Sequence, residues 1–598
     1  MGARDSLVGA WAVTSGEGLF GLGISSSTSS ATSHSLGYAT NYIPCSTSFF
    51  PKKPPQFNNR RRNPVVKFTC KAKNGETSPG KFDRRDVLLG LGGLYSTSLA
   101  ANPMALAYPA LPDFKHCVDA TQPDNIDKTG IGINCCPPPV DRSRIKDFVP
   151  CVTTVNTRKP AYLFDVSSDY YKKYTSAIQK MKNLSPSDPR NFRQQANIHC
   201  ANCDGGYYLV GSPELYDVHY SWLFFPWHRW YLYFFEKICQ NLIDDDTFTL
   251  PFWNWDAPEG MQIPSIYNSG LTSPLYDCFR NSEHLPPTVI DLEWFYGKKP
   301  EDPKIQIENN LSTMYRQMIT QSKTPTDFFG KAYRAGDDPP TIGDAGQIEL
   351  TPHNDVHVWT GISEPPNAID LGALYSSARD PMFYAHHSNV DRLWTIWVNK
   401  LGGSNFTDPD WLFTKFIFYN EEAKPVRVSI KDGLDITKLG YKYEDVPIPW
   451  LDDSAKPKPR AKAKTLPSAP DPAQVFPTTL DKPINVIVKR PKKSGIGSSE
   501  EILVIEGIEY DKRNYVKFII YINEDDVNTC RPNNTEFLGS FSNLPHGHQM
   551  TAKARKKFRI SQVLEELGAD RDKVLVTLIP KSNYPVKING IKIEFEDS

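Results

Sequence analysis

Half of the twelve histidines of this chain fall into two groups of three, a common number of protein ligands for one metal ion. The groups are His199, His219 and His228, followed by His353, His357 and His387. His353 and His357 are four residues apart, so on a helix their rings lie on one face and can chelate one ion. This pair alone is weak evidence, because a single histidine on an apolar helix is more often a hydrogen-bonded core residue.

The sequence around the histidines favours metal binding. His228 lies in the aromatic segment Trp222–Trp230. His387 comes shortly after Phe383 and Tyr384. An imidazole buried among such rings costs a few kcal/mol if it lacks a polar partner. One ion bound by three rings satisfies them together, so we predict two metal sites.

The ligand type narrows the choice of metal. Neutral imidazoles without thiolates suit copper, zinc or nickel. Carboxylate-bridged di-iron sites use paired Glu-x-x-His motifs, and no such motif accompanies these histidines. A catalytic zinc ion would need only one set of three ligands. Two sets therefore predict a pair of copper ions.

The elements that must position the histidines are mainly helical. Four windows have the apolar pattern of amphipathic or buried helices: Tyr171–Met181, Leu223–Leu242, Asn309–Gln321 and Asn389–Leu401. Clusters of Pro and Gly separate these windows, which predicts long loops. The tryptophans are concentrated between residues 108 and 451. We therefore predict one mainly helical domain over residues 108–451.

The composition changes after this domain. Residues 452–475 alternate Lys and Pro, which cannot build a core, and they predict an extended linker that proteases can reach. Four β-rich runs then predict a small β domain over residues 476–598: Ile484–Val488, Glu501–Ile505, Val516–Ile522 and Val574–Ile579. One short helix is expected within it, over Phe558–Leu567.

The first 107 residues are a different kind of sequence. They carry 12 basic and five acidic side chains, although the whole chain has 68 of each. A stretch rich in Ser and free of acidic residues, Gly18–Gly75, is typical of an organelle transit peptide. A twin-arginine pair, a short apolar stretch and an A-x-A site follow, namely Arg84-Arg85, Val87–Leu94 and Ala105–Ala107. We expect a bipartite leader over residues 1–107 that directs the chain to the chloroplast thylakoid lumen.

Composition also disfavours two classes of partner. The net charge of zero argues against a nucleic-acid-binding protein, which normally has a basic excess. No apolar run reaches the roughly 18 residues that a membrane span needs. We therefore expect no nucleic-acid partner and no membrane span.

Six of the eleven cysteines follow soon after the leader: Cys117, Cys135, Cys136, Cys151, Cys200 and Cys203. An oxidising lumen permits disulfides. Adjacent Cys135 and Cys136 cannot easily pair with each other, so each is expected to tie down a different segment. The spacing does not fix the connectivity. Cys200 and Cys203 form the chain's single C-x-x-C motif, so a Cys₄ zinc site is not expected.

Four longer motifs resemble those of a known family: His199–Cys203, Trp222–Glu236, Pro251–Asp256 and Asp380–Arg392. They are similar to the plant polyphenol oxidases, the tyrosinase and catechol oxidase family with a type-3 copper pair. The resemblance extends over leader, helical domain, linker and C-terminal domain. It implies a mainly α catalytic domain, in which a four-helix bundle holds a dicopper centre, followed by a small C-terminal β-sandwich domain.

The resemblance also assigns the residues of the centre. It implies that copper A takes the first group of three histidines and copper B the second. His386, next to a ligand, is expected to support the site rather than bind the metal. A thioether bond between Cys203 and His219 is implied as well. The implied disulfides are Cys117–Cys136 and Cys135–Cys200.

Three further residues are expected near the substrate. The resemblance implies that Glu349, one helical turn before His353, and Asn354, directly after it, orient a water that helps to deprotonate a phenol. Many plant members place a Phe over the copper site, where this chain has Leu374. A smaller side chain there would admit bulkier phenols.

The function implied by this resemblance is the copper-dependent oxidation of o-diphenols to o-quinones with O₂, together with ortho-hydroxylation of monophenols. Two alternatives stay open. One is a specialised biosynthetic oxidase or hydroxylase acting on one plant phenolic of the aurone or lignan type, and the other is a haemocyanin-like oxygen-binding protein. The expected partners are phenolic small molecules, O₂ and a protease that cleaves the linker and so removes a shielding C-terminal domain.

Overall fold

The computed structural model describes residues 109–119, 134–362, 369–460, 466–492, 499–526, 528–545, 551–569 and 571–597. All of them belong to one compact unit, Asn58–Ser598. The expected leader, residues 1–107, lies outside the described residues. Within the described ranges, every helix is too short or too polar to cross a membrane.

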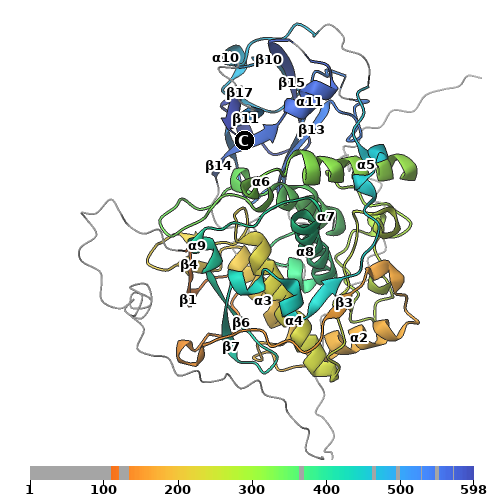
Figure 1. Ribbon diagram of the computed structural model, residues 1–598, viewed down its shortest axis with the longest axis vertical. Helices are drawn as coiled ribbons and strands as arrows, with labels where there is room; N and C mark the ends of the chain where they lie inside the picture. Colours follow the sequence, from red (N-terminus) through yellow and green to blue (C-terminus); the bar gives the residue numbers. More distant parts are fainter. Residues whose placement is uncertain are drawn as a thin grey trace, which may run out of the picture. The chain divides into compact units, whose positions relative to one another are not determined.

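Three helices carry predicted ligands, namely α3 (Phe192–Cys203), α4 (Phe224–Ile243) and α8 (Met382–Lys400), and α2 (Asp169–Lys182) packs against α3 and α4. Side-chain caps begin two of them, because Ser168 accepts the Tyr171 N–H and Asn191 accepts the Arg193 N–H. α4 is buried on nearly all of its faces, as expected for a helix that is apolar all round. It contacts both α2 and α8 (Figure 1).

Two π-helical turns interrupt the helical pattern. α5 (Pro303–Tyr315) continues into η6 (Arg316–Thr320), and η8 (Glu349–Asn354) leads directly into α7 (Asp355–Thr360). Within η8, Thr351 has extended dihedral angles, φ −138° and ψ 122°, and Pro352 has no N–H to donate. An ordinary α-helix therefore cannot run through this segment, and the geometry of one α-helical turn between Glu349 and His353 was a wrong expectation.

The helical region also carries short strands and helices. Its strands are β1 (Pro112–Cys117), β2 (Lys146–Asp147), β3 (Asn156–Arg158), β4 (Tyr207–Leu209), β5 (Leu215–Tyr216), β6 (Lys415–Tyr419), β7 (Pro425–Ser429) and β8 (Tyr441–Tyr443). They form three small sheets, β1-β4-β5, β2-β7-β6 and β3-β8. The short helices are α6 (Pro325–Phe329) and α9 (Pro409–Leu412).

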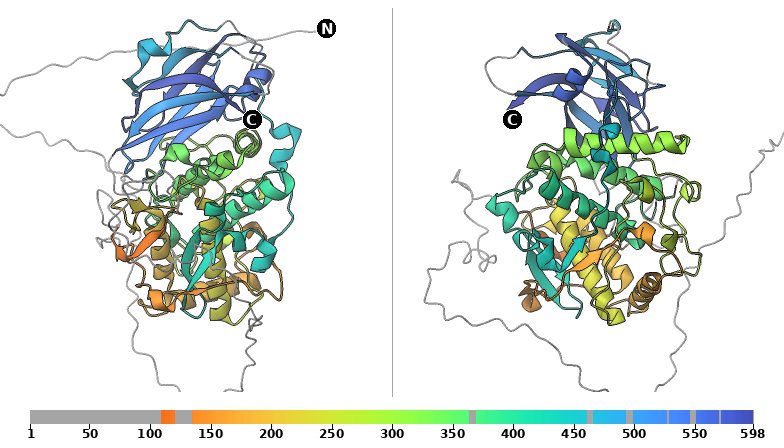
Figure 2. Two further views of the ribbon diagram at one scale, coloured as in Figure 1. Left: turned by 60° about the vertical axis from the view of Figure 1, so that its left-hand side comes forward. Right: turned by 45° about the vertical axis from the view of Figure 1, so that its right-hand side comes forward.

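Two antiparallel sheets make up the C-terminal region (Figure 2). One has the order β10-β15-β12-β13, and the other β14-β11-β16-β9 with β17 also paired to β11. The strands are β9 (Thr478–Thr479), β10 (Ile484–Lys489), β11 (Ser499–Tyr510), β12 (Val516–Ile522), β13 (Phe537–Asn543), β14 (Ala552–Arg559), β15 (Lys573–Pro580), β16 (Lys587–Ile588) and β17 (Gly590–Asp597). Apolar residues from both sheets share one core, as in a β-sandwich.

Helical and sheet content agree with the sequence-based predictions, with shifted boundaries. The window Asn309–Gln321 is the end of α5 together with η6, because Asp302 caps the helix at its true start. The helix expected over Phe558–Leu567 is α11 (Ser561–Glu566), since the preceding residues complete β14. Apolar alternation along β14 was the signal for a strand there.

The two regions share apolar contacts. Leu544 and Tyr515 of the C-terminal region belong to the core of the helical region. Conversely, Ile342 and Leu350 belong to the core of the sheets. The segment that contains η8 therefore lies at the junction between them.

The predicted linker, 452–475, is not extended free chain throughout. The Ala455 carbonyl accepts from Ser312 Oγ at 2.7 Å, and the Lys458 N–H donates to the Asn533 carbonyl at 3.0 Å. Arg460 forms an ion pair with Glu524. Lys and Pro prevent a core but leave backbone carbonyls and charges free to dock, so residues 452–460 lie against the protein. The end of the linker forms α10 (Pro472–Val475), and residues 461–465 lie outside the described part.

Candidate metal centre

The fold brings all six predicted histidines into two adjacent buried clusters. α3 provides His199, the segment before α4 provides His219, and α4 provides His228. The second group comes from η8, α7 and α8. Each ring is at most 2% exposed. Potential ligand atoms lie within 4.8 Å of one another in each of two clusters, His199–Cys203–His219–His228 and His353–His357–His386–His387.

Ring nitrogens converge in the second cluster. His357 Nε2 is 3.1 Å from His353 Nε2 and 3.3 Å from His387 Nε2. His353 Nδ1 lies 3.0 Å from the Glu349 carbonyl, and His357 Nδ1 lies 2.6 Å from the Leu371 carbonyl. A carbonyl only accepts, so these Nδ1 atoms carry the protons and the Nε2 lone pairs face one another. Two nitrogen ligands about 2.0 Å from one ion at a tetrahedral angle lie about 3.3 Å apart, so this cluster fits a metal ion.

The first cluster has the same character. His228 Nδ1 lies 2.8 Å from the Phe224 carbonyl, and His219 Nδ1 lies 3.2 Å from the Cys203 carbonyl. Neither ring nitrogen of His199 nor Nε2 of His228 has a hydrogen-bond partner among the described residues. The three ring centroids are 5.4–5.8 Å apart. Buried nitrogens without partners, arranged around one point, again fit a metal ion.

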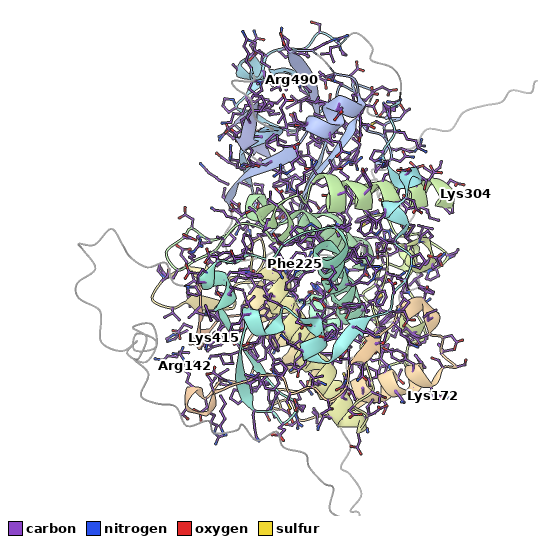
Figure 3. The ribbon with its side chains drawn as sticks, viewed as in Figure 1. Arg142, Lys172, Phe225, Lys304, Lys415 and Arg490 are labelled. Atoms are coloured by element: carbon purple, nitrogen blue, oxygen red, sulfur yellow. A yellow bond between two sulfur atoms is a disulfide. The ribbon has the colours of Figure 1, made fainter. Side chains whose placement is uncertain are left out.

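Aromatic rings enclose the two clusters and bring them together. The His228 and His387 rings stack at 4.3 Å, which joins the first cluster to the second. The ring centroid of Phe224 lies 4.7 Å from that of His228 and 4.8 Å from that of His353. Its neighbour Phe225 marks this part of the helical region in Figure 3. Two ions bound here would therefore be close neighbours in an apolar, dry environment.

Burial sets the protonation state of these rings. It lowers the pKa of His357 to about 3 and places the pKa of His199, His228, His353 and His387 well below the ordinary value of 6.5. The rings are therefore neutral at physiological pH. A neutral imidazole is the form that binds metals.

His386 differs from its neighbour His387. Its Nδ1 accepts a hydrogen bond from Trp255 Nε1 at 3.1 Å. In a neutral ring whose Nδ1 accepts, Nε2 must carry the proton, so no lone pair remains for a metal. Hydrogen bonding therefore favours His387 as the ligand and gives His386 a supporting place.

The cysteines lie where the resemblance placed them. Disulfides join Cys117 to Cys136 and Cys135 to Cys200, which anchors the N-terminal segment on α3 beside His199. Cys203 is a buried thiol in the first cluster. Burial raises the pKa of this thiol well above its usual range.

Glu349 and Asn354 are the first and last residues of η8 and have different hydrogen-bond partners. Glu349 is fully buried, and its Oε1 accepts the Tyr220 N–H at 2.6 Å. Burial raises the pKa of Glu349 well above its usual range. The Asn354 amide donates to the Ser542 carbonyl of β13 at 3.3 Å. In the full chain, therefore, the C-terminal region occupies the amide that was expected to hold a water.

Leu374 is 1% exposed and belongs to the core that surrounds the centre. It follows Leu371, whose carbonyl orients His357, by three residues. The segment thus lies beside the second cluster.

A network of buried ion pairs behind the centre was missed by the sequence analysis. Arg392 lies 3.0 Å from Asp256, which also accepts from Asn389 at 3.0 Å and from Trp450 at 2.9 Å. Arg229, directly after His228, pairs with an Asp of α8 at 2.5 Å, namely Asp391. The signal was present, because Asp256 and Arg392 end two of the motifs that carried the resemblance.

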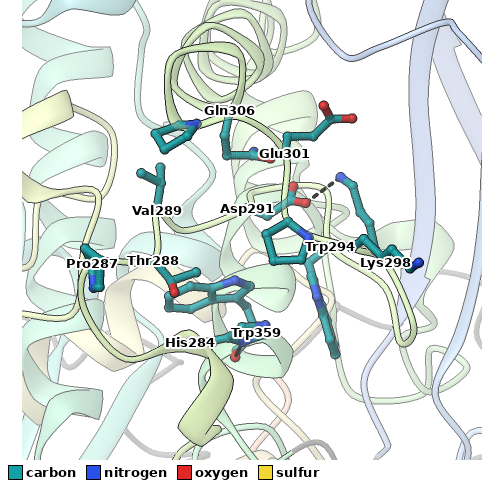
Figure 4. Close-up of a pocket in the computed structure, with 13 residues that line it drawn as sticks. His284, Pro287, Thr288, Val289, Asp291, Trp294, Lys298, Glu301, Gln306 and Trp359 are labelled. Carbon is teal, nitrogen blue, oxygen red and sulfur yellow. Dashed lines mark hydrogen bonds and ion pairs between the residues drawn. The ribbon is translucent and has the colours of Figure 1, made fainter. Parts of the chain in front are cut away.

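Two cavities of the described part of the chain have other linings than the six predicted ligands. One of about 240 Å³ is bordered by His284, Trp294 and Trp359 (Figure 4), and another of about 430 Å³ is bordered by Trp394 and Thr437. None of the six histidines lines either cavity. Because the six rings are at most 2% exposed, a substrate can reach the candidate centre of the full chain only if something moves.

Comparisons with known proteins agree with this arrangement. Residues 189–400 match the common central domain of tyrosinase, residues 405–456 the polyphenol oxidase middle domain, and residues 476–595 the chloroplastic polyphenol oxidase C-terminal domain. The chain is 47% identical to "Polyphenol oxidase, chloroplastic" of Malus domestica over 568 residues, covering 90% of this chain and 93% of that protein. It is 42% identical to "(+)-larreatricin hydroxylase, chloroplastic" of Larrea tridentata, covering 90% of this chain and 96% of that protein. Among solved structures, latent aurone synthase (polyphenol oxidase) from a natural source matches with a TM-score of 0.75 at 36% identity, covering 82% of this chain and 99% of that one.

Proposed function

This chain belongs to the plant polyphenol oxidase family, and on that premise we propose that it oxidises o-diphenols to o-quinones with dioxygen at a pair of copper ions. The observation that carries the proposal is the convergence of neutral, buried ring nitrogens at 3.1 and 3.3 Å, beside a second cluster of the same kind. Imidazole ligands of this kind suit copper. In the overall reaction, two diphenols and one dioxygen give two quinones and two waters.

We propose that His199, His219 and His228 hold copper A, and that His353, His357 and His387 hold copper B. When bound, the two ions supply the exchange of two electrons between a diphenol and dioxygen. The chain's own contribution is orientation. Backbone carbonyls fix the proton on Nδ1 of four of the six rings and leave Nε2 for the metal. Phe224 and Phe383 pack against the rings and exclude water.

Two features of the family are proposed here as well. The four-helix bundle consists of α3, α4, α7 and α8. Together with η8, the turn that leads into α7, these helices carry five of the six ligands. The thioether forms between Cys203 and His219, which is supported by the presence of both in the first cluster. Mass spectrometry of a peptide spanning both residues tests the bond, because the link removes two hydrogens from the expected mass.

Hydroxylation of monophenols is the finer part of the proposal. Glu349 and Asn354 orient a water that accepts the phenol proton once the Asn354 amide is released from Ser542. Support comes from the place of both residues in η8, next to ligand His353. Both reactions need the centre to open, and hydroxylation also needs the Asn354–Ser542 hydrogen bond to break.

A specialised hydroxylase or oxidase for one plant phenolic is the second candidate. Relatives named for larreatricin and aurone chemistry belong to the same family. Leu374, smaller than the Phe that the resemblance led us to expect, favours a bulkier substrate. Turnover of tyramine, a simple catechol and a dimeric phenolic should be compared in the Leu374→Phe variant and the unaltered chain. A selective loss of the dimeric substrate supports this candidate, whereas equal changes count against it.

An oxygen carrier is the least favoured reading. A carrier needs a permanently shielded site, whereas the Lys- and Pro-rich linker proposed to be cleavable would allow the cover to be removed. We propose that a protease cuts within residues 452–475 and exposes the centre. The composition of residues 1–107 and the chloroplastic names of the relatives support transport to the chloroplast, with the thylakoid lumen as destination.

Copper content tests the function directly. Metal analysis of the purified chain should give about two copper ions per molecule, one for each cluster. His228→Ala should lose copper and diphenol oxidation together, because it removes a ligand at the contact between the clusters. His116→Ala, which alters an exposed histidine far from both in sequence, is the control and should keep both. One ion per chain, or full activity in His228→Ala, would contradict the proposal.

A further inference from the structure

A lysine of the C-terminal region is completely buried against η8 and α7, the segments that carry His353 and His357. Lys517, on β12, is 0% exposed. Its Nζ lies 2.7 Å from Asp355 Oδ1 and 3.2 Å from Glu293 Oε2. Both carboxylates belong to the helical region. An ammonium and two carboxylates taken out of water are each costly alone, so the three groups depend on one another.

Strand β13 completes the polar contacts of the two carboxylates. Ser540 Oγ donates to Glu293 Oε2 at 2.7 Å, and Ser542 Oγ donates to Asp355 Oδ1 at 3.2 Å. The Ser542 carbonyl accepts from Asn354, the residue before Asp355. Within its own region Asp355 has the Thr351 hydroxyl at 3.2 Å. The C-terminal region therefore provides the ammonium that pairs with both carboxylates and most of the hydrogen bonds at this point.

Asp355 lies between two metal ligands in the chain. It begins α7, and His357 follows two residues later, about 200° further round an ideal helix. The two side chains therefore leave α7 on nearly opposite sides. One side carries the proposed copper ligand, and the other is held by Lys517.

The outer side of α7 also borders free space. Trp359, four residues after Asp355, lies on the same face and stacks on His284 at 4.5 Å. The two rings border the cavity of about 240 Å³ together with Trp294, whose ring packs edge-on against His284 (Figure 4). A helix that faces a cavity has room to shift when the contact that fixes it is removed.

We propose that Lys517 is a positioning residue for the copper-B histidines. It acts through Asp355 and fixes α7, and thereby the place of His357 and His353. The C-terminal domain then supports the metal site as well as covering it. This inference rests on the proposed dicopper function. A domain that acted only as a cover would leave the ligands unchanged when its contacts with α7 are lost.

The rate at which bound copper passes to a chromogenic chelator tests this in the full-length protein. Lys517→Met and Asp355→Asn should each accelerate copper loss, by about 10–100-fold, as the removal of groups that orient metal ligands does. The double variant should lose copper about as fast as the faster single variant, because both changes break the same contact. Glu501→Gln is the matched control, since it breaks a buried ion pair with Arg490 that lies wholly within the C-terminal domain. It should leave the rate unchanged.

Two outcomes overturn the inference: copper loss from folded Lys517→Met as slow as from the unaltered chain, or equal acceleration by Glu501→Gln. If Lys517→Met does not fold, Ser542→Ala removes only one hydroxyl from Asp355 and should still give a severalfold acceleration. No acceleration in that variant also overturns the inference. If the unaltered chain binds no copper at all, the proposed function fails instead, and the two failures are thus distinguished.

Discussion

Buried charges hold the proposed copper centre on two sides, and the two sides are built differently. On the side of α4 and α8, the pairs Asp256–Arg392 and Arg229–Asp391 lie within the helical region. On the side of α7, Asp355 and Glu293 take their positive partner, Lys517, from the C-terminal domain. The first support remains when the C-terminal domain leaves, and the second is lost. The difference teaches that η8 and α7, unlike α4 and α8, take part of their buried polar contacts from another domain.

The largest expected effect comes from breaking an ion pair on the side of α4 and α8. Arg392→Met leaves the fully buried Asp256 without its positive partner, which costs about 3–5 kcal/mol of unfolding free energy. Denaturant unfolding of the full chain measures this. Lys400→Met, which removes an exposed pair with Asp445, is the control and should cost less than about 1 kcal/mol. Similar losses in the two variants would show that the buried pair contributes no more to stability than an exposed one.

The second effect concerns the chemistry on the side of α7, where Glu349 and Asn354 lie in the preceding turn η8. After the linker is cut and the C-terminal domain removed, Glu349→Gln should lower monophenol hydroxylation about 100-fold, as the loss of a proton-accepting arrangement does, and catechol oxidation much less. Asn354→Gly should act in the same direction. Steady-state kcat for both substrates measures the ratio. Parallel losses of both activities would make these residues structural.

A smaller effect is expected from the cut itself. Because the histidines are at most 2% exposed, the intact chain must open before it can oxidise a catechol. Cutting within residues 452–475 should raise catechol turnover by about tenfold, equivalent to about 1.4 kcal/mol of opening free energy. Copper loss should also accelerate, but less than in full-length Lys517→Met, because Asp355 and Glu293 then face water. If an active cut form retained copper as firmly as the intact chain, the contacts of Lys517 with Asp355 and Glu293 would be dispensable for copper binding.

The last effect is a pH dependence of docking. Burial lowers the pKa of Lys556 on β14 to about 7, against 10.5 when exposed, despite nearby Asp327 and Glu349. Its Nζ contacts Gln347 of the helical region at 3.3 Å. Between pH 7 and 10.5 the exposed lysine binds a proton that the docked one does not, so docking weakens as pH falls through this window.

Because a single proton is involved, the free energy of docking changes by at most about 1.4 kcal/mol per pH unit. The temperature at which the C-terminal domain separates from the helical region measures this pH dependence. It can be followed by limited proteolysis at pH 7 and pH 9. Lys556→Met should flatten the dependence. An unchanged slope in that variant would assign the effect to other groups.

Much of the site could be predicted from the sequence, because local patterns determine it. The spacing and aromatic surroundings of the histidines predicted two metal clusters, and the apolar windows predicted α4 and α8. The π-helical turn η8 was missed, although Pro352 within it argues against an uninterrupted α-helix. Lys517 could not be found in this way, because its partner Asp355 is 162 residues away in the chain. The disulfide pairing required the family resemblance, since spacing leaves several connectivities open.

The place of Lys517 in its sheet has a consequence for how the molecule can open. β12 is paired with β13 on one side and with β15 on the other, and all seven of its residues are buried. An ammonium fixed on an inner strand cannot swing away with a loop, so it leaves only if the sheet moves as one body. Opening is then all-or-none for each molecule. Intermediate activity in a sample reflects the fraction of open molecules, and an agent that loosens the domain changes that fraction rather than the width of an entrance.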